Sequence, residues 1–280
     1  MAVKFLGQFL LERGQITPQQ LLAATEAQRA SNPLLGELAV RQGLLSEPQA
    51  RRINERQRAE DRRFGDIAME LGLLDGPEVE ALLAAQKAGR KLFGQVLLEL
   101  GVLDAETLEA ALAAHRADQE AGSQALSSAL ASHPLGELAE AASGLCIRLF
   151  PRMLGAQCQV AGVATAVDAP AWPCTAHVRI TGARDLRVGL ACDASTMHAM
   201  ASAFLRIPPE RCDTELAVDA LGEIVNVLMG YVVRNALPDD AEYRATPPDF
   251  TRSAALMTDE GAVALQMNSQ LGPFLLLVGE

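Results

Sequence analysis

The sequence predicts two halves of different fold class. The N-terminal half is expected to be all-α and built from helical repeats, because an apolar–Gly pair recurs every 29 residues up to about residue 115. The C-terminal half is expected to be α+β with a largely antiparallel sheet, because short alternating segments surround a long apolar helix. The expected ranges are 1–58 and 59–117 for two pairs of repeats, 118–131 for a linker, and 132–280 for the second domain.

Each repeat is predicted to be a helix–turn–helix unit. The apolar–Gly pairs that open the four units are Leu6-Gly7, Leu35-Gly36, Phe64-Gly65 and Phe93-Gly94. A second glycine follows in each unit, suited to the left-handed conformation just past a helix end: Gly14, Gly43, Gly72 and Gly101. The second helix then begins at an N-cap residue: Thr17, Ser46, Asp75 and Asp104. In three units Gln20, Gln49 and Glu78 complete a capping box.

The second half is predicted to contain three main helices and five strands. The expected helices are 135–154, kinked or ended near Pro151, then 193–205 and 214–236. The expected strands are 157–167, 175–182, 186–192, 261–269 and 272–280. Strands that follow one another closely favour hairpins and hence an antiparallel sheet.

Composition excludes several classes of function. The net charge is −11, with 14 basic against 17 acidic residues up to Asp118 and 10 against 18 beyond it, so a nucleic-acid partner is not expected. The first residues do not resemble a signal peptide, and no stretch approaches the ~20 apolar residues of a membrane span, so a cytoplasmic protein is expected. The five cysteines form no CxxC or Cys/His cluster, so neither a metal site nor a disulfide framework is expected.

One polar stripe lies on the apolar helix 214–236. Asp219, Glu223 and Asn226 stand at i, i+4 and i+7 and therefore share one face, with Gly222 and Gly230 on or beside it. Burying these groups without partners would cost about 1–3 kcal/mol each. The stripe is therefore a buried polar network, a solvated strip, or an edge left open for another protein. The sequence contains no G-x-S-x-G, Walker A or strand-linked GxGxxG motif that would place the chemistry elsewhere.

The first half resembles the MshEN domain, the N-terminal module of type II secretion and type IV pilus assembly ATPases. The resemblance rests on units 5–28, 34–57, 63–86 and 92–115, which are joined by five-residue spacers. Members with an opening Arg and a closing Gln bind cyclic di-GMP. Only the third unit keeps both, as Arg63 and Gln86, so the resemblance implies a cyclic di-GMP site of Arg63, Gly65 and Gln86. The alternative is an interaction module that binds no nucleotide.

The second half resembles the CheC/CheX/FliY family, which dephosphorylates response regulators of the CheY type. The resemblance is carried by Asp219-x3-Glu223-x2-Asn226 and Gly230, by Pro247 or Pro248 further on, and by the CheX-like order of elements across about 130–280. It implies that Asn226 orients a water, that Glu223 pairs with the receiver's lysine, and that Asp219 supports them. Phosphoaspartate and Mg²⁺ would belong to the receiver, so no cofactor of this chain is expected, whereas a homodimer is.

A similar spacing occurs in the expected helix 135–154. Leu135-Gly136-Glu137, with Glu140 and Gly144, matches Leu221-Gly222-Glu223 with Asn226 and Gly230, but Glu140 replaces the amide, so no second catalytic site is expected. Two functions follow from the whole sequence. The first is a motility or chemotaxis phosphatase regulated or localised by its repeats. The alternative is a non-enzymatic adaptor that joins a receiver, or pilus or secretion machinery, to a cyclic di-GMP signal.

Overall fold

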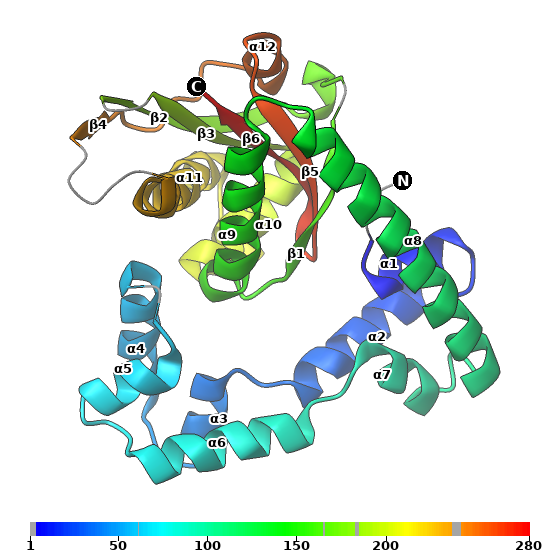
Figure 1. Ribbon diagram of the computed structural model, residues 1–280. Helices are drawn as coiled ribbons and strands as arrows, with labels where there is room; N and C mark the ends of the chain where they lie inside the picture. Colours follow the sequence, from blue (N-terminus) through cyan, green and yellow to red (C-terminus); the bar gives the residue numbers. More distant parts are fainter. Residues whose placement is uncertain (1–3, 61, 165, 183–184, 237–241) are drawn as a thin grey trace. The chain divides into compact units, whose positions relative to one another are not determined.

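The structure is a computed structural model that describes residues 4–60, 62–164, 166–182, 185–236 and 242–280 (Figure 1). The chain separates into two compact units. One comprises Phe5–Arg116, and the other comprises Ala117–Glu280. The N-terminal unit is helical, and the C-terminal unit combines helices with an antiparallel sheet, as the sequence predicts.

The N-terminal unit consists of alternating short and longer helices. The short helices are α1 (Leu6–Glu12), α3 (Leu35–Arg41), α5 (Phe64–Glu70) and α7 (Phe93–Glu99). The longer helices are α2 (Pro18–Ser31), α4 (Glu47–Glu60), α6 (Gly76–Gly89) and α8 (Ala105–Ala131).

The expected helix boundaries are confirmed by the caps. The side-chain oxygen of Thr17 accepts a hydrogen bond from the backbone N–H of Gln20, and the Gln20 side chain accepts one from the backbone of Thr17. The same reciprocal pairs join Ser46 to Gln49 and Asp75 to Glu78. Asp104 accepts from the backbone N–H of Thr107. The four glycines that end the short helices have φ between 63° and 72°, the left-handed region that disfavours other residues: Gly14, Gly43, Gly72 and Gly101.

The glycines that open the short helices serve close packing. A Cβ at Gly65 would lie 2.6 Å from Cγ1 of Val79, which stands on the following helix α6. A Cβ at Gly7 would lie 2.5 Å from Cδ1 of Leu21 on α2. The recurring glycine therefore allows each short helix to approach its neighbour closely.

Two buried clusters hold the unit together, and they differ from the expected pairing of 1–58 and 59–117. One cluster joins α1 and α2 to α7 and α8, through Leu10, Ile16, Ala24, Val96, Leu97 and Ala111. The other joins the two middle helix pairs, through residues such as Ala39, Ile53, Ile67 and Leu82. The first helix pair thus packs on the last, and the second on the third. The physical reason is that each helix pair buries its apolar side only against another helix pair. Because the four pairs are similar in sequence, nothing in the sequence indicates which two pairs pack together.

Side-chain amides near the ends of the longer helices reinforce this nested pairing. Nε2 of Gln28 donates to the backbone carbonyl of Lys91 at 3.4 Å, and Nε2 of Gln86 donates to that of Pro33 at 2.9 Å. Gln57 donates likewise to Arg62 at 3.0 Å. Each carbonyl stands just before the opening residue of the partner pair. In the fourth unit the closing residue is His115, whose ring lies edge-on to Phe9 with centroids 5.1 Å apart.

The segment expected as a linker, 118–131, is helical. It forms the second part of α8, which runs without a break through the boundary between the two units. Its alanines are strong helix formers, and this propensity exceeds the contribution of its scattered serines.

The C-terminal unit contains a six-stranded antiparallel sheet in the order β1-β5-β6-β3-β2-β4. The strands are β1 (Cys158–Val163), β2 (Cys174–Gly182), β3 (Leu186–Cys192), β4 (Tyr243–Ala245), β5 (Val263–Ser269) and β6 (Gly272–Gly279). Its helices, besides the end of α8, are α9 (Gly136–Leu154), α10 (Ala194–Leu205), α11 (Thr214–Ala236) and α12 (Ala254–Asp259). Two 3₁₀ turns complete it, η1 (Ala169–Ala171) and η2 (Pro209–Arg211).

The sheet has an apolar core on each face. Alternate residues such as Val178, Leu190 and Leu276 pack against α9, α10 and α11 on one face. On the other face Leu275 and Leu277 belong to a smaller cluster with Met257 of α12. Figure 1 shows the sheet with α9, α10 and α11 beside it, and the larger core lies between them and fixes the orientation of α11.

Most expected elements of this unit are present, with local differences. The segments 186–192 and 214–236 match β3 and α11, and Pro151 lies inside α9, which continues to Leu154. The sequence interpretation missed β4 and α12, because each is too short to show a period.

The expectation that no stretch approaches the length of a membrane span requires correction. Residues Thr214–Asn235 of α11 are long and apolar enough to span a membrane by length and composition. Within the domain, 61% of the apolar window is buried, so α11 has the burial of a core helix. The polar residues of the exposed stripe interrupt the apolar run, so the sequence alone shows no continuous apolar stretch of this length.

Candidate functional site

The candidate site is the exposed edge of α11. Asp213 caps the start of the helix, and its carboxylate accepts a hydrogen bond from the backbone N–H of Leu216 at 2.9 Å. Its apolar side is buried against the sheet, α9 and α10, with Leu221, Ile224 and Val225 each at most 2% exposed. This burial on three sides leaves one narrow edge facing solvent.

All three polar residues of the stripe lie on that edge. Asp219, Glu223 and Asn226 are exposed, as is Gly230 one turn beyond. The stripe is therefore no buried polar network, and its side chains carry no burial penalty. Of the alternatives left by the sequence, a solvated strip and an open edge for a partner remain.

The two glycines of the stripe differ in what surrounds them. A Cβ at Gly222 would lie 2.7 Å from Cζ of Phe250 and 3.1 Å from Cβ of Pro248, so this position is occupied by another segment of the same chain. A Cβ at Gly230 would meet nothing within 4 Å. The expectation that both glycines leave room for a partner is therefore wrong for Gly222, whereas Gly230 has open space beside it.

The segment that covers Gly222 is fixed to the edge of the sheet. β4 pairs with β2, and Thr246 continues the contact by donating its backbone N–H to the Arg179 carbonyl at 2.8 Å. Asp249 and His177 then exchange two backbone hydrogen bonds of 2.8 and 2.9 Å. The chain therefore reaches Pro248 and Phe250 in a defined conformation.

A polar cluster lies where this segment meets the outer face of the sheet. His177 is only 4% exposed, and its Nε2 lies 3.6 Å from Oδ2 of Asp249. Burial lowers the pKa of His177, and the neighbouring Asp249 carboxylate opposes that shift in part. Nearby, Nη1 of Arg187 pairs with Oε2 of Glu260 at 2.7 Å and lowers the pKa of that carboxyl.

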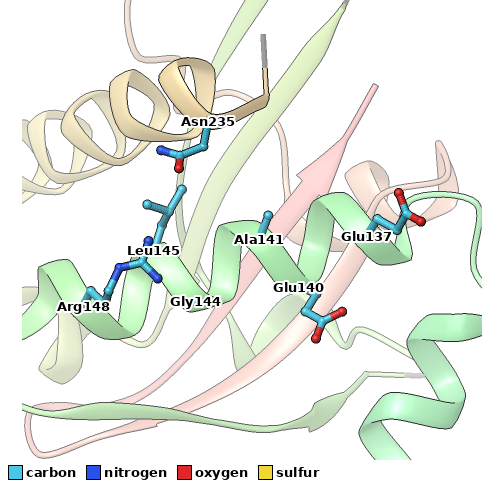
Figure 2. A pocket seen from close by; sticks show the side chains of 7 residues that line it. All are labelled: Glu137, Glu140, Ala141, Gly144, Leu145, Arg148 and Asn235. Carbon is cyan, nitrogen blue, oxygen red and sulfur yellow. The ribbon is translucent and has the colours of Figure 1, made fainter.

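The corresponding stripe on α9 borders a shallow groove of about 350 Å³ (Figure 2). The residues lining it are Glu137, Glu140, Ala141, Gly144, Leu145 and Arg148 of α9, and Asn235 near the end of α11. A Cβ at Gly136 would lie 1.9 Å from the backbone carbonyl oxygen of Leu130, so the chain's own backbone covers this glycine. No amide occupies the Asn226-like position of α9, because Glu140 stands there.

The three residues expected to bind cyclic di-GMP have mixed surroundings. Arg63 is exposed at the N-terminus of α5. Gly65 is accounted for by its contact with Val79, and Gln86 is hydrogen-bonded to the Pro33 carbonyl. Two of the three residues therefore have roles in packing and pairing.

The stripe itself can position groups but supplies no nucleophile or metal. Within the part of the chain that the structure describes, no three His, Cys, Asp or Glu side chains cluster as metal ligands. An exposed carboxylate and an exposed amide one turn apart can pair with a cation and hold a water. The edge therefore presents an exposed carboxylate and an exposed amide on one helical face.

The C-terminal unit matches one known family of domains. Residues 174–267 match the family model described as chemotaxis phosphatase CheX, so the C-terminal unit contains a CheX-like domain. The matched range begins with β2, ends in β5, and includes Asp219, Glu223, Asn226 and Phe250. No curated protein matches the sequence.

Similar solved structures include the chemotaxis protein CheX of Desulfovibrio desulfuricans, with 17% identity and a TM-score of 0.42, covering 51% of this chain and 98% of that one. A complex of CheX with CheY, BeF₃ and Mg²⁺ from Borrelia burgdorferi has 16% identity and a TM-score of 0.38, covering 51% and 94%. FliY of Thermotoga maritima has 15% identity and a TM-score of 0.36, covering 51% and 86%.

Proposed function

We propose that the C-terminal domain dephosphorylates the phosphoaspartate of a response-regulator receiver. The observation that carries this proposal is the exposure of Asp219, Glu223 and Asn226 on one edge of α11, inside the segment that matches the CheX family model. An exposed acid–amide edge without a nucleophile suits a protein that completes the active site of another protein.

In the proposed reaction Asn226 enters the receiver's active site and orients a water molecule. The water oxygen attacks phosphorus in line, the bond between phosphorus and the aspartyl oxygen breaks, and the electron pair stays on the restored carboxylate. The water protons leave with inorganic phosphate and solvent. The contribution of this chain is positioning, which is the main requirement of phosphoryl transfer.

Glu223 is proposed to pair with the receiver's active-site lysine and so hold α11 in register. Asp219 stands one turn earlier on the same edge and supports this contact. Mg²⁺ belongs to the receiver in this proposal, and it neutralises charge on the phosphoryl group there. No cofactor of this chain takes part.

The test is the decay of a phosphorylated receiver with wild-type protein and with Asn226→Ala. Accelerated phosphate release by the wild type, lost in the variant, supports the proposal. If no receiver loses phosphate faster but some bind, the domain is an adaptor instead. The proposal also places the protein in the cytoplasm with its receiver, and a homodimer would appear as a doubled mass in light scattering.

The N-terminal helices are proposed to act as the regulatory or localising input, similar to MshEN modules of pilus and secretion ATPases. Cyclic di-GMP is the ligand to test there, because the exposed Arg63 offers a planar guanidinium for phosphate or guanine. Calorimetry should give binding heat with the wild type and a reduced signal with Arg63→Ala. A silent wild-type titration would leave this half as a protein-interaction module.

A further inference from the structure

Phe250 lies on the same edge of α11 as the candidate site, although it comes from another part of the sequence. Its ring reaches the backbone of α11 at Gly222, where a Cβ would lie only 2.7 Å from Cζ. Despite this contact, Phe250 remains 41% exposed. The ring of Phe250 thus packs on the helix backbone at Gly222 and is still partly exposed to solvent.

The position of Gly222 places this ring within the polar stripe. Gly222 follows Asp219 by three residues and precedes Asn226 by four, and side chains at these spacings share one helical face. The ring therefore occupies the place between Asp219 and Asn226 that a side chain at position 222 would otherwise take. A partner that approaches Asn226 from the Gly222 side of this edge would meet Phe250.

The backbone that carries the ring is fixed by hydrogen bonds before any partner arrives. Two backbone hydrogen bonds join Asp249 to the buried His177. The Asp249 carboxylate accepts from both the backbone N–H and the hydroxyl of Thr251 at 2.7 Å. Pro248, on the other side of Asp249, also contacts the Gly222 position. Preorganisation of this kind reduces the entropy lost on binding.

We infer that Phe250 is a docking and specificity residue for the receiver, seated on the Gly222 backbone beside Asn226. This inference rests on the proposed function. The partner it selects presents an apolar side chain, or the aliphatic stem of a lysine, next to its phosphorylated carboxylate. Partly exposed aromatic residues beside charged groups are the typical anchors of protein interfaces.

The test measures docking separately from turnover. Binding is measured with Asn226→Ala protein and a receiver that carries beryllium trifluoride in place of the phosphoryl group, and turnover is measured with the Asn226 protein. Adding Phe250→Ala should weaken binding about tenfold and raise KM by a similar factor, with kcat nearly unchanged. Phe250→Leu, which keeps an apolar side chain, should recover most of the affinity.

Two further variants separate docking from folding. Leu256→Ala removes a comparably exposed apolar side chain, 46% exposed on α12, and should leave both KM and thermal stability unchanged. Gly222→Ala keeps Phe250 but adds a Cβ that displaces the ring, so it should raise KM as Phe250→Ala does. Circular dichroism melting curves confirm that each variant is folded.

The outcomes distinguish this inference from the proposed function. Unchanged affinity in folded Phe250→Ala and Gly222→Ala, with affinity lost in Glu223→Ala, overturns the inference and leaves the phosphatase proposal standing. If receivers bind without losing phosphate, the phosphatase proposal fails, and the affinity of Phe250→Ala still decides the inference. If no receiver binds the wild type, both are rejected.

Discussion

Helices α9 and α11 present similar residue spacings with opposite consequences. Each has a Leu-Gly-Glu step followed by a polar residue three positions later and a glycine four positions after that. On α11 the polar residue is Asn226, and an exposed aromatic ring covers Gly222. On α9 it is Glu140, and the backbone of Leu130 covers Gly136.

The comparison shows that spacing alone determines which residues face outward. The identity of the polar residue then decides the chemistry, because an amide both donates and accepts hydrogen bonds, whereas a carboxylate would repel a phosphoryl group. The segment that covers Gly222 on α11, or Gly136 on α9, decides which surface a partner can contact there.

Asn226→Ala should lower kcat for receiver dephosphorylation by about 10²-fold, because the water loses its positioning group. The measurement is phosphate release under saturating phosphorylated receiver. Adding Glu140→Asn to this variant should not restore the rate, because the receiver is proposed to dock on α11 through Glu223, so an asparagine on α9 would not reach its active site. Full activity in Asn226→Ala would move the chemistry away from α11.

Gly136→Ala should destabilise the protein by about 2–3 kcal/mol, because the new Cβ would lie 1.9 Å from a backbone oxygen that cannot rotate away. Gly222→Ala should cost less, since the ring of Phe250 can move and alanine favours helix. The measurement is urea denaturation followed by circular dichroism. Equal losses of stability in Gly136→Ala and Gly222→Ala would contradict the difference between a rigid backbone oxygen and a movable ring as the covering group.

Glu223→Gln should raise KM for the phosphorylated receiver about tenfold, because it removes a charge from the proposed ion pair while keeping the side-chain shape. Glu137→Gln, the equivalent change on α9, is the matched control and should leave KM unchanged. An equal effect of both substitutions would mean that general charge, and not α11, governs docking.

Gly144→Ala and Gly230→Ala should each stabilise the protein by about 0.5–1 kcal/mol, since both positions have room for a Cβ in a helix. Their effects on the receiver should differ, with weaker binding only for Gly230→Ala. Thermal melts and the binding assay together provide the check. Unaltered affinity in Gly230→Ala would show that the partner does not approach this glycine.

Acid should destabilise the segment that carries Phe250. Burial lowers the pKa of folded His177 below its unfolded value of about 6.5, so the unfolded chain binds the proton more readily. The stabilising contribution is therefore present above that value and is lost as pH falls toward the folded pKa. His177→Gln should show a shallower fall in melting temperature between pH 7 and 5, whereas parallel curves would contradict this assignment.

Regular elements and their ends follow from local sequence in this protein. The capping residues Thr17 and Asp75 define helix starts, and the alternation in 186–192 matches β3 in full. The spacing also puts Asn226 on one face with Asp219 and Glu223, but a buried polar network was an open alternative, and only the packing of α11 shows that this face is exposed.

Long-range arrangements do not follow from local sequence. Four similar helix pairs contain no signal that joins the first to the last, and the Pro-Pro-Asp-Phe segment at 247–250 has no period to reveal that it covers Gly222. Gly222 indicates that another segment approaches the helix closely, but not which segment of the chain does so. The role of Phe250 therefore required the structure.

The nested pairing of the N-terminal helices has a consequence for the order of folding. Ile53 and Ile67 of the inner cluster are close in sequence, whereas Leu10 and Leu97 of the outer cluster stand at opposite ends of the unit. Closing the longer loop costs more chain entropy, so the middle helices should assemble first and the ends should close over them. During synthesis, α1 and α2 would therefore emerge from the ribosome early yet remain without their partner until α7 and α8 are made.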